Sequence, residues 1–278
     1  MKAAAISEIA KMEFGIQVRS RWMLGFGILF AALVAGVSYY GLTFLGYEAK
    51  FQDFYRTTVT MLNLVLIIVP VVALVAGGQS LCGDPGYFEF LASQPIGRTD
   101  ILLGKVFGLF AALTLMTVLG FGLGGLIIAF KTQSDGIWKY FVFVGVSVAL
   151  GLVFICLAAL LSILSGRRPM AIVTALILWL FFLFVYDLIV LSASYYIDEA
   201  YLRNMLYFSL LGNPVDLARV VVLMSVGGES ALGAAGAGLL RMFGGDVMSA
   251  IAATGLFLIW ILAPLSGAAL LFRRQDIT

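Results

Sequence analysis

Six runs of apolar residues, each long enough to cross a lipid bilayer as a helix, dominate this sequence. A hydrocarbon core of ~30 Å needs about 20 helical residues, and a helix satisfies its backbone hydrogen bonds internally where no water is available. The sequence therefore predicts an all-α integral membrane protein with six transmembrane helices. The runs cover residues 22–45, 58–81, 101–130, 138–165, 170–194 and 250–272.

The polar remainder of the chain is too small to form a water-soluble surface. Hydrophobic residues make up 62% of the 278 residues and charged residues 12%, whereas a soluble domain carries about 25% charged residues. The net charge of +2 indicates no nucleic-acid partner. No histidine and only two cysteines are present, which excludes a disulfide framework and any histidine-based catalytic or metal site. We expect one transmembrane domain over residues 1–278, without a metal or cofactor of its own.

Lysines and arginines in the connections predict the orientation, because cytoplasmic loops are enriched in both. With the N-terminus inside, ten of them lie on the cytoplasmic side and seven lie outside. The pairs Arg167–Arg168 and Arg273–Arg274 directly adjoin span ends on the inner side. Both termini are therefore expected in the cytoplasm. Residues 1–21 contain no early apolar core, so we expect no cleavable signal.

Residues 1–21 predict an amphipathic helix that lies in the cytoplasmic membrane interface before the first span. At 100° per residue the apolar side chains fall on one arc and most polar ones fall on the opposite arc, with Glu13 as the exception. The apolar arc holds Ile6, Ile9, Ala10, Met12, Phe14 and Ile16, and the polar arc holds Ser7, Glu8, Lys11 and Arg19.

The connection between the fifth and sixth spans, residues 195–249, is the longest extramembrane part of the chain. Asn213 is a plausible helix N-cap, with Pro214 at the first helical position and Asp216 in the first turn. Pairs of glycines then bracket residues 229–243. We expect two short extracytoplasmic helices here and no independent domain. The methionines of this region are not clustered at helical spacing, which favours packing over a soft-metal site.

Two features inside the spans need a separate interpretation. The motif GFGLGG at 120–125 matches the dinucleotide fingerprint in letters, but it lies within a span and lacks the preceding strand. It therefore indicates close helix packing through small residues. Asp187 is the one acid well inside a predicted span. An intramembrane carboxylate needs a partner, so it is either a gating or substrate-path residue or a structural hydrogen-bond partner of another helix.

Several stretches resemble the permeases of the ABC-2 family of transporters. The most specific is SQPIGRTDILLGK at 93–105. The others are KMEFGIQVRSRWML, WLFFLFVYDL, LLGNPVDLARV and WILAPLSGAALLFRRQDI, so the resemblance extends over nearly the whole chain. One departure is visible: LCGDPG keeps a single acid, Asp84, where family members carry several.

The resemblance implies that residues 82–98 form a cytoplasmic coupling helix that docks in a groove on a separate ATPase subunit. Pro85 and Gly86 turn the chain out of the membrane, and the aromatic residues that follow supply an apolar face that a solvated loop would not need. The residues expected at this interface are Asp84, Tyr87, Phe88, Glu89, Phe90, Leu91 and Arg98.

The same resemblance implies the partners of the chain. They are a second copy of itself, two copies of the ATPase with its ATP and Mg²⁺, the lipid bilayer of a bacterial inner membrane, and a periplasmic β-helix protein. The implied role is maturation of the copper sites of nitrous oxide reductase. We expect the periplasmic partner on 195–249, near Arg203, Glu229 and Arg241.

Two alternatives remain at this point. One is an ABC-2 exporter of lipid, peptide or drug. The other is an intramembrane enzyme, which the lack of any catalytic pair opposes. We therefore expect a transporter subunit, with catalysis confined to the partner ATPase.

Overall fold

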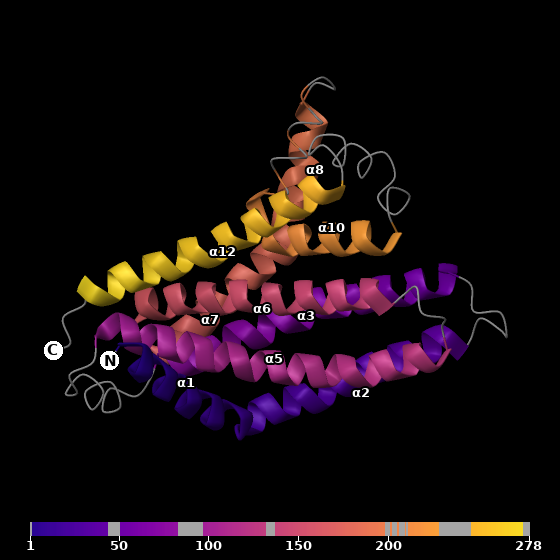
Figure 1. The fold of residues 1–278 in the computed structure, drawn as a ribbon. Coiled ribbons are helices and arrows are strands. Elements are labelled where there is room, and N and C mark those ends of the chain that lie inside the picture. The colour runs from indigo at the N-terminus through magenta and orange to yellow at the C-terminus, as the bar shows by residue number, and fades with distance from the viewer. Residues whose placement is uncertain are drawn as a thin grey trace.

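The computed structural model describes residues 2–43, 51–82, 97–131, 137–197, 201, 205, 209, 211–227 and 246–274. Within these residues every regular element is a helix, and six helices are long and apolar enough to cross a membrane (Figure 1). The all-α, six-span prediction is therefore confirmed. The elements are α1 (Lys2–Val18), α2 (Arg21–Thr43), α3 (Phe51–Leu81), α5 (Arg98–Lys131), α6 (Ile137–Ser165), α7 (Arg168–Leu180), η2 (Phe181–Val185), α8 (Tyr186–Tyr196), α10 (Pro214–Gly227) and α12 (Asp246–Arg274).

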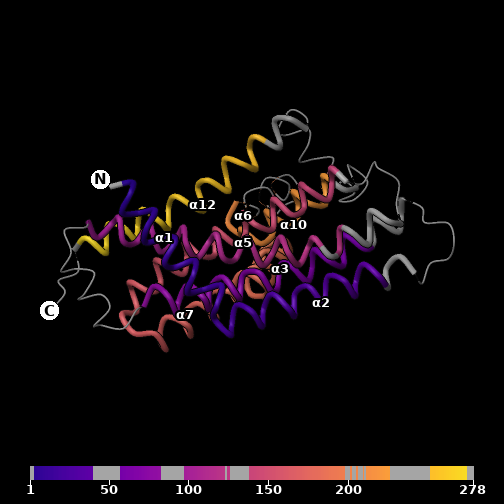
Figure 2. The backbone as a smooth tube through the Cα atoms, turned by 60° about the horizontal axis from the view of Figure 1, so that its bottom comes forward, coloured from indigo at the N-terminus to yellow at the C-terminus, as the bar shows by residue number. Residues whose placement is uncertain are grey.

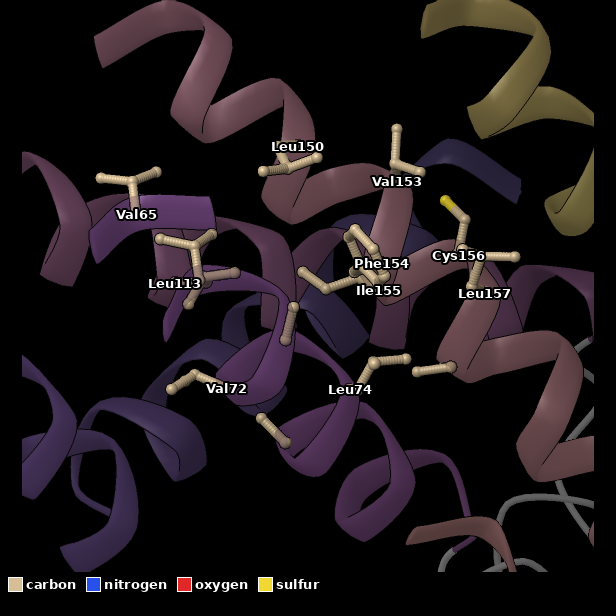
Figure 3. Close-up of a cluster of buried hydrophobic side chains, with 14 of the residues drawn as sticks. Val65, Val72, Leu74, Leu113, Leu150, Val153, Phe154, Ile155, Cys156 and Leu157 are labelled. Carbon is tan, nitrogen blue, oxygen red and sulfur yellow. The ribbon is translucent and has the colours of Figure 1, made fainter. Parts of the chain in front are cut away.

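The core lies between α3, α5 and α6. In the most apolar stretch of each span, 61% of the residues are buried in α3 and in α5, and 56% are buried in α6. In the span made of α7, η2 and α8 only 11% are buried. Figure 3 shows the apolar side chains that α3 and α6 contribute to this core, together with Leu113 of α5. Edge-to-face aromatic pairs continue the core from α2 to α6, because Phe121 contacts both Phe30 and Phe143, with ring centroids 5.2 and 5.0 Å apart.

Glycines of α5 let α1 and α2 lie directly against it. A Cβ at Gly104 would lie 2.7 Å from Ile9 Cβ, and one at Gly120 would lie 2.4 Å from Phe30 Cδ1. Farther along, a Cβ at Gly124 would lie 2.5 Å from Val34 Cγ1. As the contacts move along α5 from Gly104 to Gly124, the residues they meet move from Ile9 in α1 to Val34 in α2. The helices α1 and α2 are therefore parallel to α5. The close packing predicted for 120–125 is thereby confirmed.

The helix predicted near the N-terminus is present, and it packs on α5 through a face that includes polar side chains. Glu13 is 3% exposed and Gln17 is 9% exposed, whereas Met12 and Ile16 are exposed. The side of α1 that faces the protein therefore holds Glu13 and Gln17, and Met12 and Ile16 lie on the side away from it. The physical reason is that α1 packs against the glycine-lined side of α5, where the polar atoms of Glu13 and Gln17 find hydrogen-bond partners. The location of α1 in a membrane interface stays a prediction.

The fifth span is interrupted by a π-helix. In η2 the backbone N–H of Tyr186 donates to the carbonyl of Phe181, five residues earlier. Figure 1 shows α8 rising away from the layer formed by α2, α3, α5 and α6. The short helix α10 then lies against α6 and α3. Its predicted cap is confirmed, since the Val215 N–H donates to Asn213 Oδ1 (3.0 Å). The second short helix expected, at 229–243, lies outside the described residues.

The start of α1 and the end of α12 lie at the same end of the bundle in Figures 1 and 2. The connection between α6 and α7 lies at that end as well. There Gly166 adopts a φ of 66°, a left-handed conformation that favours glycine at the end of a helix. Arg167 and Arg168 follow it directly. The arrangement fits an even number of spans, and which side is cytoplasmic stays a prediction.

Candidate functional site

The expected ATPase-docking segment lies outside the described residues, including Asp84, Tyr87, Phe88, Glu89, Phe90 and Leu91. Its two flanks are described. The chain leaves α3 at Leu81 and Cys82 and returns at Gly97 and Arg98, the latter half-buried at the start of α5. The candidate site is therefore built from the helices that hold these two flanks in place.

A buried polar network joins α1 to both flanks. Ser80 Oγ donates to Glu13 Oε1 at 2.6 Å, and Gln17 Nε2 donates to the same oxygen at 2.7 Å. On the other side of Ser80, its backbone carbonyl accepts a hydrogen bond from Lys105 Nζ at 2.8 Å. Glu13, Ser80 and Lys105 thus connect the N-terminal helix, the end of α3 and the start of α5.

The network extends from Cys82 to the fourth and fifth spans. Cys82 Sγ donates to the Ser162 carbonyl at 3.2 Å, and Arg168 Nε donates to the Cys82 carbonyl at 2.7 Å. Burial raises the pKa of the Cys82 thiol above its ordinary value, so this cysteine is a packing and hydrogen-bonding group. Cys156 is likewise a free, buried thiol. We call Glu13, Gln17, Ser80, Cys82, Lys105, Ser162 and Arg168 the inner polar network.

The inner polar network fixes the relative positions of its helices, although burying its charged groups costs desolvation free energy. Glu13 and Lys105 are each only 3% exposed, and a buried charge costs several kcal/mol unless it is paired and hydrogen-bonded. Their hydrogen bonds offset that cost only in one arrangement of α1, α3 and α5. The network can therefore hold the two flanks of 83–96 in a fixed relation to α1 and α7.

Analysis of the sequence alone missed this network. A lysine in the otherwise apolar start of α5 and an acid on the apolar arc of α1 were the available signals. The glycines at 104 and 108, four residues apart on either side of Lys105, were a third. A Cβ at Gly108 would lie 2.5 Å from the Ala10 carbonyl oxygen. Small residues at this spacing let a second helix approach closely.

A second polar cluster surrounds Asp187, and we call it the outer polar cluster. Arg219 Nη1 lies 2.8 Å from Asp216 Oδ1 and 3.7 Å from Asp187 Oδ2. Asn213 Nδ2 donates to Asp216 Oδ2 and to the Phe182 carbonyl, both at 2.8 Å. Burial raises the pKa of Asp216 to about 7, with the neighbouring Asp187 carboxyl as a further cause.

The structure thus gives Asp187 the partner that an acid in a span needs, on a helix 32 residues further along the chain. Its side chain is 44% exposed, so it lies at the edge of the protein core. Whether it also acts in gating stays a prediction. Arg203, Glu229 and Arg241, expected to dock a periplasmic partner, lie outside the described residues. Among the residues that are described, no group of three or more cysteines or acids could hold a metal ion.

Comparisons with known proteins agree with this architecture. The family model described as "ABC-2 family transporter protein" matches residues 7–277. The chain is 32% identical over 276 residues to the probable ABC transporter permease protein NosY of Pseudomonas aeruginosa, covering 97% of this chain and 98% of that protein. It is 30% identical over 275 residues to the probable NosY of Stutzerimonas stutzeri, covering 96% and 97%. The chain therefore belongs to the ABC-2 family of transporter permeases.

Proposed function

We propose that this chain is a NosY-type permease subunit, two copies of which work with two copies of a NosF-like ATPase in a bacterial inner membrane. Its similarity over nearly its whole length to two proteins named as NosY permeases carries this proposal. ATP and Mg²⁺ belong to the partner ATPase, and this chain transmits the work of hydrolysis across the membrane. Both termini then lie in the cytoplasm.

The inner polar network supports a route for that transmission. Force applied to 83–96 by the ATPase reaches the end of α3 and the start of α5. Glu13 passes it to α1 through Ser80, and Arg168 passes it to the fifth span through the Cys82 carbonyl. Buried, hydrogen-bonded groups resist bending because each displacement leaves a donor or acceptor unmet.

Docking of the ATPase depends in this proposal on the aromatic residues Phe88 and Phe90. Burying one phenylalanine side chain stabilises a contact by about 1.5–3 kcal/mol. The double variant Phe88→Asp/Phe90→Asp should therefore lose the ATPase during co-purification while the permease still reaches the membrane. Complete retention of the ATPase by this variant would show that 82–98 is not the coupling helix.

The connection 195–249 is proposed to dock a NosD-like periplasmic protein and so to link ATP hydrolysis to copper-site maturation of nitrous oxide reductase. Photo-crosslinkers at Arg203, Glu229 and Arg241 should capture that protein, with a yield that changes between nucleotide-free and ATP-bound complexes. Crosslinks confined to positions in 46–57 and 131–137 would contradict the docking surface. A yield independent of nucleotide would contradict the transmission.

The specific role is tested by replacing NosY with this chain in a denitrifying bacterium. Restored copper content and activity of nitrous oxide reductase is the expected result. The control is a chain with the Phe88→Asp/Phe90→Asp substitutions, which should not restore either. If ATP hydrolysis remains coupled to the permease but copper content is not restored, the alternative of an ABC-2 exporter of lipid, peptide or drug replaces the NosY-type role.

A further inference from the structure

A groove between α2 and α3 opens on the surface of the bundle. It encloses about 340 Å³, and its walls are apolar apart from Arg21 at one end. Trp22 and Leu29 of α2 line one side, and Ile67 and Val71 of α3 line the other. An apolar groove with a single cation suits a ligand with an apolar chain and an anionic group.

The position of the groove along α2 fits a bilayer, with charged and aromatic side chains at the level of the headgroups and apolar side chains at the level of the acyl chains. The break between α1 and α2 falls at Ser20, whose Oγ accepts a hydrogen bond from the Met23 N–H at 3.1 Å. The apolar span begins directly after it, at Arg21. Arginine and tryptophan at the end of a span sit at headgroup level. Leu29 is eight residues further, or ~12 Å deeper at the rise of an α-helix.

Arg21 is available to bind an anion. Its side chain is exposed, and within the described residues no ion pair includes it. A guanidinium pairs with phosphate in a bidentate geometry that a single ammonium cannot reproduce. The charge at the mouth of the groove therefore complements a phosphate whose headgroup carries no cation of its own.

A glycine provides the room for an acyl chain. A Cβ built on Gly25, which lines the groove, meets no atom within 4 Å. The same holds for Gly36, farther along α2, which does not line it. The two positions form a matched pair, since a larger side chain at Gly25 fills the groove and one at Gly36 does not.

We propose that this groove binds one phospholipid with a net negative headgroup, such as phosphatidylglycerol, with its phosphate on Arg21 and an acyl chain between α2 and α3. The lipid is a bound component of the permease on the leaflet at this end of α2. The proposal does not depend on the NosY-type role, because it follows from the groove and its charge alone.

Trp22 reports on the lipid that occupies the groove. The full chain, with Trp138, Trp179 and Trp260 replaced by Phe, is reconstituted into vesicles of phosphatidylcholine and phosphatidylglycerol in which one or the other lipid carries brominated acyl chains that quench tryptophan. At equal mole fraction, brominated phosphatidylglycerol should quench Trp22 with about fivefold higher relative affinity, since one basic residue near the surface favours an anionic lipid by ~1 kcal/mol. A chain that keeps only Trp260, which has no lysine or arginine within ten residues of it in the sequence, should show no such preference.

Two substitutions separate the headgroup contact from the acyl-chain contact. Arg21→Gln should remove the preference for phosphatidylglycerol and leave total quenching unchanged. Gly25→Leu should reduce quenching by both brominated lipids, while Gly36→Leu should not. Thermal unfolding in detergent checks that each variant is folded. A preference that survives Arg21→Gln, or quenching that survives Gly25→Leu, would overturn the proposal. So would a Trp22 shielded from both lipids, which would show that a second copy of the chain covers the groove.

Discussion

The inner polar network and the outer polar cluster both tie helices together across long stretches of sequence, but they do so in different ways. In the inner network, Glu13 and Lys105 are almost fully buried, and Lys105 and Arg168 donate to backbone carbonyls. In the outer cluster, Asp187 is 44% exposed and lies 3.7 Å from its arginine.

This difference indicates two mechanical roles. A buried hydrogen bond is costly to leave unmade, whereas an ion pair near the surface contributes little and is easily exchanged. The inner network is thus suited to hold α1, α3, α5 and α7 together during a movement. In the outer cluster, the Asp187–Arg219 pair is suited to let α8 and α10 change their relation, while the buried hydrogen bond from Asn213 to the Phe182 carbonyl holds α10 against η2. Four predictions test this contrast, from the largest expected effect to the smallest.

Glu13→Leu should have the largest effect, because it leaves the Ser80 hydroxyl and the Gln17 amide without their acceptor. Each buried donor left unpaired costs about 1–3 kcal/mol, so the expected loss of stability is about 2–6 kcal/mol. Thermal unfolding in detergent measures it. Glu13→Gln keeps an acceptor oxygen and should lose less. Equal unfolding midpoints for wild type and Glu13→Leu would show that the inner network is not a structural tie.

Asp216 predicts a pH dependence of stability for the outer cluster. Burial raises its pKa from 3.8 to about 7. Between these two pKa values the folded chain keeps a proton on Asp216 that the unfolded chain has released. The contribution of this group to the free energy of unfolding is therefore present at low pH and is lost as the pH rises. The midpoint of wild type should therefore fall relative to Asp216→Asn between pH 5 and pH 8. Parallel profiles would contradict the assignment.

Asp187→Leu should change stability by less than about 1 kcal/mol, because its ion pair is long and partly exposed. Its effect on ATP-coupled activity or on dimer stability should be larger than that of Asp187→Asn, which keeps a hydrogen-bonding group. Hydrolysis by the reconstituted complex and the oligomeric state in detergent are the measurements. Wild-type behaviour of Asp187→Leu in both would remove any role beyond packing.

Lys11→Ala provides the baseline for the comparison. Lys11 and Glu8 form an ion pair of 2.8 Å on the exposed side of α1, where both side chains are more than two-thirds exposed. Such pairs have little or no measurable effect, so the unfolding midpoint should equal that of wild type. A shift comparable with that of Glu13→Leu would mean that α1 responds to any change of charge and not to the inner network.

The six spans could be predicted because the bilayer permits few alternatives. Each apolar run had to become a helix, and Asn213 with Pro214 marked the start of α10 by local rules alone. The burial of Glu13 could not be derived in the same way. A helical projection shows that an acid lies on the apolar arc, but its acceptor role depends on Ser80, which is 67 residues away.

Two features of the outer half of the fifth span were equally hidden. Nothing in FFLFV, which contains neither proline nor glycine, indicates a π-helix. The pairing of Asp187 with Arg219 depends on how the chain returns from α8 to α10. Local sequence patterns therefore predict the helices. The polar contacts between helices can be identified only when the packing of those helices is known.

The π-helix η2 changes the direction in which the second half of the fifth span presents its side chains. One extra residue in a helical turn rotates all that follows by ~100°, so α8 faces a different direction from the one that α7 alone would give it. A regular α-helix through the same five residues would turn Asp187 away from Arg219, while leaving Arg168 against Cys82. Deleting one residue from 181–185 would instead restore a regular helix and keep Asp187 on the side of Arg219. The two halves of the span thus present their side chains in directions that are set separately. The number of residues between the halves determines how one face is turned relative to the other.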